Sequence, residues 1–202
     1  GTMETVRPIV DATRLIYQSS AAPAVGGVTL AGMIRNSPGV PGEPMRLFGR
    51  YAVVLLVDGA GHYADANGVR LAVAPGDLIT VFPDLAHTYG PGAGQHWSEF
   101  YIVFEGPLFD VWRAKGLLDP ARPKSHLEPL DYWLRRLEAI LQPGSDLSRT
   151  CRMQQFLADV VDHGRRSAMA ADDNAWLPQA QRLMNALETD PPLRPEEAAE
   201  AL

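Results

Sequence analysis

Residues Gly68 to Tyr89, GVRLAVAPGDLITVFPDLAHTY, give the clearest structural signal in the chain. The first residues of this stretch alternate between apolar and other side chains with the period of a half-buried strand. Pro75-Gly76-Asp77 then predicts a tight turn, because proline presets φ at one corner and glycine allows a positive φ at the next. A second apolar strand, Leu78 to Phe82, ends at the next proline. His87 and Tyr89 follow two residues apart, so we expect their side chains on one face.

Short strands and turns continue outward from this hairpin through the first part of the chain, where most of the glycine and proline lies. Asn67-Gly68 is a strong hairpin signal. We expect further strands over residues 27–34, 45–57, 62–66 and 97–104, and a loop over residues 90–94. Short antiparallel strands joined by tight turns are typical of a small barrel or jelly roll.

Helical periodicity replaces the strands in the second part of the chain. After a short helix over residues 109–115, an apolar stripe predicts a helix over residues 130–141 that carries Leu130, Trp133, Leu134, Leu137 and Leu141. Ser145 or Asp146 can cap the next helix, which presents Met153, Phe156 and Leu157. Two such helices with a short link form an antiparallel hairpin, which can pack on the barrel or against a second copy of itself.

Beyond this hairpin we expect a linker of small and acidic residues over 169–174, a third helix over 176–187 and the start of a fourth at Pro195. The fourth helix would stop after about two turns, so we expect a chain that is cut within a helical region. The predicted fold class is therefore mainly β plus α, a jelly-roll barrel followed by helices.

Composition and charge exclude several classes of protein. There are 18 basic and 24 acidic residues, a net charge of -6, which argues against binding of a nucleic-acid phosphate backbone by this part of the chain. The longest apolar run, Tyr51 to Val57, is too short to span a bilayer, and no signal peptide is expected. Cys151 is the single cysteine, so no disulfide forms within the chain and a reducing cytoplasm fits; we expect its thiol to be buried and inert.

A metal-dependent barrel enzyme would need three or four clustered His, Asp or Glu ligands. The histidines do not pair at short spacing, and only His62, His87 and Glu99 are placed to meet inside one barrel. We therefore expect no catalytic residues, no metal and no cofactor.

A small-molecule pocket has more support, because aromatic or polar-tipped residues recur on the predicted strands and strand ends. Trp97, Glu99 and Tyr101 alternate along one strand, and His62, Tyr63, His87 and Tyr89 accompany them. Aromatic walls with a few hydrogen-bonding groups are the usual composition of such a site. The alternative is that Trp97 and Tyr101 are simply core and that Glu99 is a solvated charge on the opposite pleat.

The segments GAGHYADANGVRLAVAPGDLITVFPDLAHTYG and WSEFYIVFEGP resemble the effector-binding cupin domain of AraC-type transcription regulators. The pattern is a glycine turn, a hairpin, Pro-Gly-Asp, a strand ending at proline, a histidine two residues before tyrosine, and a strand led by tryptophan. The resemblance implies an N-terminal arm, a barrel, helices that dimerise, a linker and the start of a helix-turn-helix DNA-binding domain. These divisions are 4–24, 25–116, 117–168, 169–175 and 176–202.

The resemblance also implies roles for particular residues. In sugar-responsive members, the ligand contacts the arginine after the early strand, the tyrosine after the histidine and alternate residues of the tryptophan-led strand, which here are Arg35, Tyr89, Glu99 and Tyr101. Glu99 stands where a histidine is expected. Together with His87 and Trp97, these are the predicted ligand-binding residues, and Leu130, Trp133, Leu134, Leu137 and Leu141 are the predicted dimer interface.

The sequence therefore predicts the ligand-sensing and dimerising portion of a bacterial, cytoplasmic transcription regulator, and not an enzyme. Its partners would be a small polar effector, a second copy of the chain and, through the full-length protein, DNA; no membrane is expected. The alternative is a metal-dependent cupin enzyme, dioxygenase- or isomerase-like, with an appended helical bundle.

Overall fold

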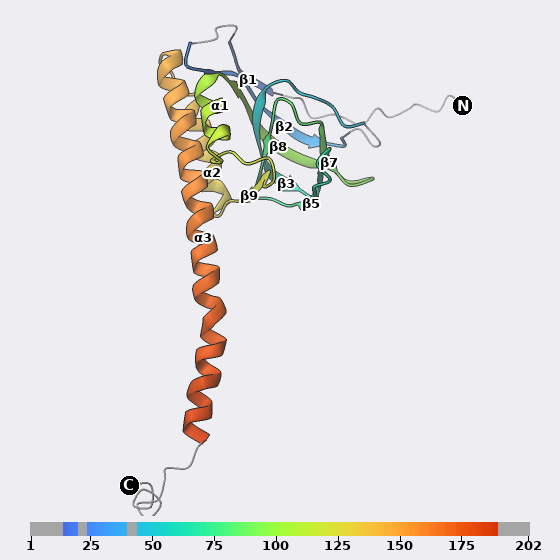
Figure 1. Ribbon diagram of the computed structural model, residues 1–202. Helices are drawn as coiled ribbons and strands as arrows, with labels where there is room; N and C mark the ends of the chain where they lie inside the picture. The colour runs from blue at the N-terminus through green and yellow to red at the C-terminus, as the bar shows by residue number, and fades with distance from the viewer. Residues whose placement is uncertain (1–13, 20–23, 40–43, 190–202) are drawn as a thin grey trace, which may run out of the picture. The chain divides into compact units, whose positions relative to one another are not determined.

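The computed structural model describes residues 14–19, 24–39 and 44–189 (Figure 1). The chain divides into two compact units, residues 1–161 and 162–202. Its strands and helices, in chain order, are β1 Arg14–Gln18, β2 Gly27–Ser37, β3 Tyr51–Gly59, β4 Gly61–Asp65, β5 Arg70–Val73, β6 Asp77–Val81, β7 His87–Pro91, β8 Trp97–Glu105, α1 Pro107–Ala114, β9 Lys124–His126, α2 Leu130–Ile140 and α3 Asp146–Thr189.

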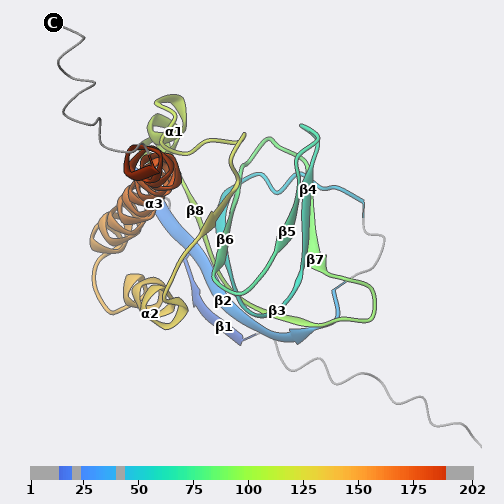
Figure 2. The same ribbon diagram turned by 90° about the horizontal axis from the view of Figure 1, so that it is seen from below.

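The first unit is built on two antiparallel sheets. The larger has the strand order β1-β2-β8-β3-β6-β9 and the smaller has the order β5-β4-β7. Figure 2 shows the small sheet facing one side of the large sheet, while the helices cover the other side. The predicted fold class, an antiparallel β-barrel followed by helices, is confirmed.

Alternation along the central strands divides the apolar residues between two cores. In β8, Phe100, Ile102 and Phe104 face the helices, whereas Trp97 and Val103 face the small sheet. β3 alternates in the same way, which explains its unbroken apolar run: both of its faces are buried. The second core, between the sheets, is the barrel interior.

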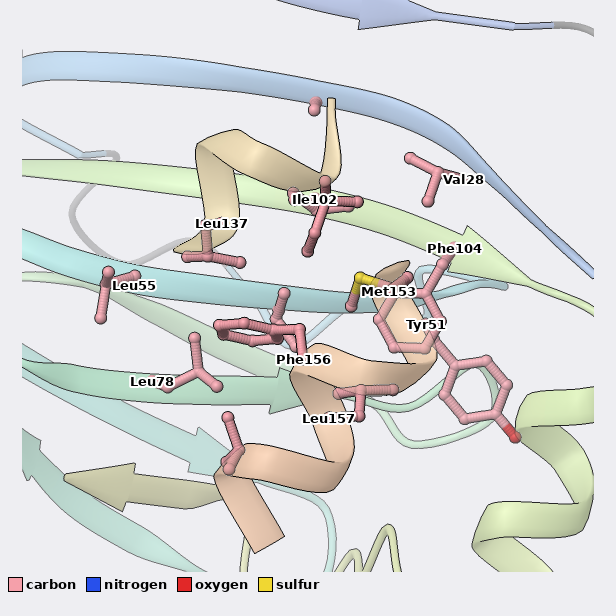
Figure 3. Close-up of a cluster of buried hydrophobic side chains, with 14 of the residues drawn as sticks. Val28, Tyr51, Leu55, Leu78, Ile102, Phe104, Leu137, Met153, Phe156 and Leu157 are labelled. Atoms are coloured by element: carbon pink, nitrogen blue, oxygen red, sulfur yellow. The ribbon is translucent and has the colours of Figure 1, made fainter. Parts of the chain in front are cut away.

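The outer core joins the barrel to the helices. Figure 3 shows Leu137 from α2 and Met153, Phe156 and Leu157 from α3 packed against side chains of the large sheet, including Ile102. Full burial of each such apolar side chain is worth about 1.5–3 kcal/mol. The buried face of the helical hairpin therefore packs on the barrel.

Several strand boundaries differ from the expected ones. Strand β3 begins at Tyr51 rather than at residue 45, and only Arg46 in the preceding segment makes an isolated bridge, to His87. The region from His87 to Pro91, expected to be a strand exit and a loop, is strand β7 and pairs with β4. Strand β9 lies in the connection expected to be irregular, and β1 lies in the expected arm. Each of these elements depends on a partner strand, which local patterns do not reveal.

Helix α3 is continuous from Asp146 to Thr189, so residues 169–174, expected to form a linker, are helical. That segment is rich in alanine and contains neither glycine nor proline, so nothing local stops the helix. The expected cap is present, because the Ser148 N–H donates to Ser145 Oγ at 3.1 Å. Cys151 is exposed, so the expectation of a buried thiol is wrong: it lies off the buried stripe that Met153 occupies.

In the second unit, α3 carries several exposed apolar side chains: Met169, Trp176, Leu177, Leu183 and Met184. The first part of the expected arm and the expected fourth helix lie outside the described residues. No helix in the described part of the chain has both the length and the apolar character that crossing a bilayer requires.

Candidate functional site

Strand β8 lines the barrel interior with Trp97, Glu99 and Tyr101. Their side chains share a face because they are two residues apart, and Glu99 pairs with Ile34 and Tyr101 with Gly32 on β2. Trp97 and Glu99 are each 4% exposed, and Tyr101 is half-buried. Glu99 is therefore not a solvated charge on the outer pleat; it is a carboxyl group inside the barrel.

Strands β4 and β7 oppose this face with a series of stacked rings. Tyr63 and His87 have ring centroids 6.4 Å apart, His87 and Tyr89 are 5.8 Å apart, and Tyr89 and Trp97 are 5.8 Å apart. Near-parallel rings at these separations favour an offset stack. The series runs from β4 through β7 to β8 and joins the small sheet to the large one.

His87 supports this stack as a neutral ring. It is 3% exposed, and its Nδ1 lies 3.1 Å from the carbonyl oxygen of Leu85, which can only accept, so Nδ1 carries the proton. Burial holds the pKa of His87 below its usual value. Tyr63 stacks on the side of His87 opposite Tyr89, and its hydroxyl donates to Asp65 at 2.9 Å. His87 therefore positions Tyr89 and does not present a charge to a ligand.

The Glu99 carboxyl is the most strongly perturbed acid in the site. Burial raises its pKa from 4.5 to about 7, while a hydrogen bond from the Trp97 side chain and the charge of Arg46 act in the opposite direction. The pKa values of Tyr89 and Tyr101 are also raised, first by burial and then by the nearby Glu99 carboxylate. A buried acid that titrates near neutrality marks a candidate functional site.

The arginine of this site is Arg46, which the sequence patterns did not identify. Its side chain hydrogen-bonds Tyr89, and its charge acts on Tyr89, His87 and Glu99. Backbone bonds hold it there: its N–H donates to the His87 carbonyl at 3.0 Å, and the His87 N–H donates to its carbonyl at 3.1 Å. No local signal marks Arg46, because the strand that places it is distant in sequence.

Arg35, the arginine expected at the ligand, does not join this group. It is exposed and lies in an irregularity of the β2–β8 pairing, between Ile34 and Ser37. The neighbouring Asn36 has a positive φ of 51° and donates its N–H to Ser98 Oγ. This bulge breaks the alternation that would otherwise assign Arg35 to a face.

Gly32 allows Tyr101 to lie across strand β2. A Cβ at this position would stand 2.5 Å from the Tyr101 hydroxyl oxygen and 2.9 Å from the Arg14 carbonyl oxygen. The Tyr101 ring therefore occupies the space of the missing side chain, close to the backbone of β1. The sequence contained the glycine but nothing to connect it with Tyr101.

His62 does not approach His87. It is exposed on β4, whereas its neighbour Tyr63 is buried in the interior. Among the residues that the structure describes, no three His, Cys, Asp or Glu side chains gather as a metal site would require. What the interior does offer is the buried Glu99 carboxyl, phenol hydroxyls and aromatic faces, while the buried Asp65 carboxyl already accepts from Tyr63.

The residues expected at a dimer interface serve the fold of the first unit. Trp133 and Leu137 are buried against the barrel, at 4% and 0% exposure. Leu130, Leu134 and Leu141 are partly buried and pack on the same core. The large apolar side chains left exposed on α2 and on the part of α3 that belongs to the first unit are Tyr132 and Leu147.

Comparisons with known proteins agree with this architecture. Residues 43–157 match the family described as the AraC-like ligand binding domain. No curated protein matches the chain.

Similar solved structures include YhaK from Escherichia coli, at 12% identity and a TM-score of 0.41, covering 59% of this chain and 52% of YhaK. An RmlC-like cupin from Methanocaldococcus jannaschii is 13% identical, has a TM-score of 0.32 and covers 55% of this chain and 97% of its own. The cupin-2 domain Rru_A2000 from Rhodospirillum rubrum is 18% identical, has a TM-score of 0.32 and covers 53% of this chain and 80% of its own. The chain thus spans about half the length of YhaK.

Proposed function

The chain belongs to the family of AraC-like ligand binding domains, and from that premise we propose that it senses a small polar effector inside the barrel. We propose further that it is the sensing and dimerising part of a bacterial, cytoplasmic transcription regulator rather than an enzyme. The proposed ligand-binding residues are Arg46, Tyr89, Trp97, Glu99 and Tyr101, with His87 supporting Tyr89.

One observation carries the proposal: Glu99 is buried in a mostly apolar barrel interior, on the face of β8 that also carries Trp97 and Tyr101. A buried carboxyl opposes folding unless it is paired, so its presence in a core needs a reason. A polar ligand that donates to this carboxyl supplies one. The half-buried Tyr89 and Tyr101 are accessible to such a ligand from solvent.

Thermal-shift screening of the chain against sugars, small acids, amines and amino acids tests the proposal. We expect at least one compound to raise the melting temperature, because a ligand that binds only the folded state stabilises it. Tyr89→Ala should abolish the effect, whereas Arg35→Ala, at an exposed position, should leave it intact. Stabilisation that survives both Tyr89→Ala and Glu99→Gln would place the binding site elsewhere.

We propose that a dimer forms through the outer surface of α2 and the first turns of α3. A substitution at Leu137 does not test this interface, because Leu137 is buried and Leu137→Glu would disrupt the fold itself. Leu147 is exposed, and Leu134 is only partly buried. We expect Leu134→Glu, Leu147→Glu to give a folded monomer by light scattering and circular dichroism; a dimer unchanged by both substitutions would refute this interface.

For the second unit we propose the beginning of a helix-turn-helix region. Its support is the exposed apolar surface of α3, which includes Trp176, Leu183 and Met184. A helix with so many exposed apolar residues needs a packing partner. A longer chain that carries the following residues should bind DNA, and we expect the present chain alone not to; a gel-shift comparison of the two, at stated salt, tests this.

A further inference from the structure

Strand β1 is the outermost strand of the large sheet and has a single neighbour, β2 (Figure 2). Four of its five residues are exposed, including Leu15 at 52% and Ile16 at 43%. The pairing with β2 is interrupted at Ile16, because the register shifts between Leu15 and Tyr17. Tyr17 is the one residue of β1 that is partly buried. The attachment of β1 therefore depends on its backbone bonds to β2 and on the contacts of Tyr17.

Arg149 of α3 contacts Tyr17 on the face of the sheet where the helices pack. Its guanidinium carbon lies 4.3 Å from the centre of the Tyr17 ring, and its Nη1 donates to the Tyr17 hydroxyl at 3.0 Å. The guanidinium also donates to Asp146 Oδ1 at 3.1 Å and to the Gly144 carbonyl oxygen at 3.3 Å. An arginine that both stacks on a tyrosine and donates to its hydroxyl fixes that ring. Tyr17 thus joins β1 to the first turn of α3.

One atom of Arg149 opposes this contact. The Arg149 side chain is 9% exposed, and in the described part of the chain its Nε is the one buried side-chain nitrogen or oxygen without a hydrogen-bond partner. A buried donor that lacks a partner destabilises the state that buries it. If Tyr17 moves away, solvent reaches the guanidinium and hydrates Nε. The unpaired donor therefore narrows the difference in free energy between the attached and the detached state of β1.

The other face of β1 adjoins Tyr101 of the barrel interior. Leu15, Gly32 and Tyr101 form one row across β1, β2 and β8, because Gly32 pairs with Leu15 on one side and with Tyr101 on the other. The Tyr101 hydroxyl occupies the space of the side chain that Gly32 lacks: a Cβ there would lie 2.5 Å from this oxygen and 2.9 Å from the Arg14 carbonyl oxygen. Tyr101 therefore extends over β2 toward the backbone of β1.

We propose that β1 is a releasable strap that links Tyr101 in the barrel interior to the first turn of α3. In the closed state, Tyr17 lies on Arg149 and β1 covers the edge of β2. In the open state, that edge is exposed beside Tyr101, the Arg149 guanidinium is hydrated, and α3 has lost its contact with β1. A change at Tyr101 inside the barrel thereby alters a contact of the helix outside it. The strap goes beyond the proposed sensing function and requires no ligand to operate.

Native-state hydrogen exchange of the full chain tests the strap. We expect the β1 amides to exchange through a local opening, at rates that low urea concentrations hardly change, whereas the amides of β3 exchange only on global unfolding. Tyr17→Phe removes the hydroxyl and keeps the ring, so it should speed exchange in β1 about tenfold and leave β3 unchanged. Amides in β1 that are as protected as those of β3, or that do not respond to Tyr17→Phe, would overturn the proposal.

Tyr132→Phe is the matched control. The Tyr132 hydroxyl also accepts from an arginine that lies over its ring, at 2.9 Å, but that arginine is Arg136 on the same helix, α2. This variant should leave exchange in β1 unchanged. Arg149→Lys keeps the charge and removes the planar fork, so it should speed exchange in β1, and adding Tyr17→Phe should then have little further effect. Fully additive effects would show that the two residues do not act through one contact.

Tyr101→Ala tests the link to the barrel interior. It removes the ring that extends over Gly32, so exchange in β1 should become faster relative to exchange in β3. The factor should be the same with and without Tyr17→Phe, because the two contacts lie on opposite faces of β1. If exchange in β1 does not respond to Tyr101→Ala, the link to the interior is wrong. None of these measurements involves a ligand, so such a failure would leave the sensing function untouched.

Discussion

Glu99 should make the stability of the ligand-free protein fall as the pH rises through neutrality, and Glu99→Gln should remove that fall. The glutamine has nearly the shape of a protonated glutamic acid, and its side-chain oxygen can still accept from Trp97. The variant therefore behaves as a carboxyl group that never ionises. The comparison isolates the cost of placing a negative charge in the barrel interior.

The magnitude follows from the pKa of Glu99, which burial raises from 4.5 to about 7. A difference of 7 − 4.5 = 2.5 corresponds to about 3 kcal/mol at about 1.36 kcal/mol for each pKa unit. Because the folded state holds its proton more tightly, this stability is fully present below pH 4.5 and is lost as the pH rises to 7. With Glu99 only 4% exposed, solvent screening reduces the figure little.

Urea denaturation of both proteins at pH 4.5 and pH 8, with one ionic strength throughout, measures the effect. We expect nearly equal free energies of unfolding at the lower pH, and a variant more stable than the wild type by about 3 kcal/mol at the higher. Glu138→Gln, which removes an exposed carboxyl on α2, is the control and should show no such pH dependence. A Glu99→Gln difference that is the same at both pH values would refute the account of the buried carboxyl.

Three further predictions concern other parts of the first unit. Gly32→Ala should cost about 1–3 kcal/mol by denaturation, because its methyl group would clash with the Tyr101 hydroxyl, and adding Tyr101→Phe should restore part of the loss; strict additivity would contradict this contact. The His126 ring nitrogens lie 2.5 Å from Glu128 and 2.8 Å from Asp77, and these carboxylates raise the pKa of His126. His126→Gln should therefore lower the free energy of unfolding by up to about 1 kcal/mol at pH 5.5, where the ring is charged, and leave it unchanged at pH 9. A larger loss of stability at pH 9 than at pH 5.5 would contradict this prediction. Elemental analysis of the purified chain should find no stoichiometric transition metal, and a bound metal lost with His87→Ala would favour the enzyme alternative.

Local chemistry made much of the barrel predictable from the chain itself. Pro75-Gly76-Asp77 and Asn67-Gly68 specify turns through their own backbone preferences, whatever surrounds them. The alternation along β8 placed Trp97, Glu99 and Tyr101 on one face because side chains of a strand alternate strictly. The stripe of α2 was equally visible, but its packing partner was not, since an apolar helix face fits a barrel as well as a second helix pair.

The position of the arginines shows most clearly what could not be predicted from sequence spacing. Arg35 follows a predicted strand and Arg46 lies in a segment expected to be strand, so sequence spacing pointed to Arg35 and gave no sign of Arg46. A bulge at Asn36 leaves Arg35 exposed, and backbone bonds to His87 bring Arg46 to Tyr89. Both effects depend on pairing between strands that are far apart in sequence.

The amino-acid sequence predicted the tight turns, the residues that share a face of a strand or helix, and the change from strands in the first part of the chain to helices in the second. Those features follow from backbone preferences and periodicity within a few residues. The burial of Glu99, the nearby charge of Arg46 and the packing of Trp133 and Leu137 against the barrel became visible only in the folded chain. Burial and charge pairing depend on which distant segments meet. Tyr89, at the end of the stretch from Gly68, becomes part of the site only because β8 places Trp97 against its ring.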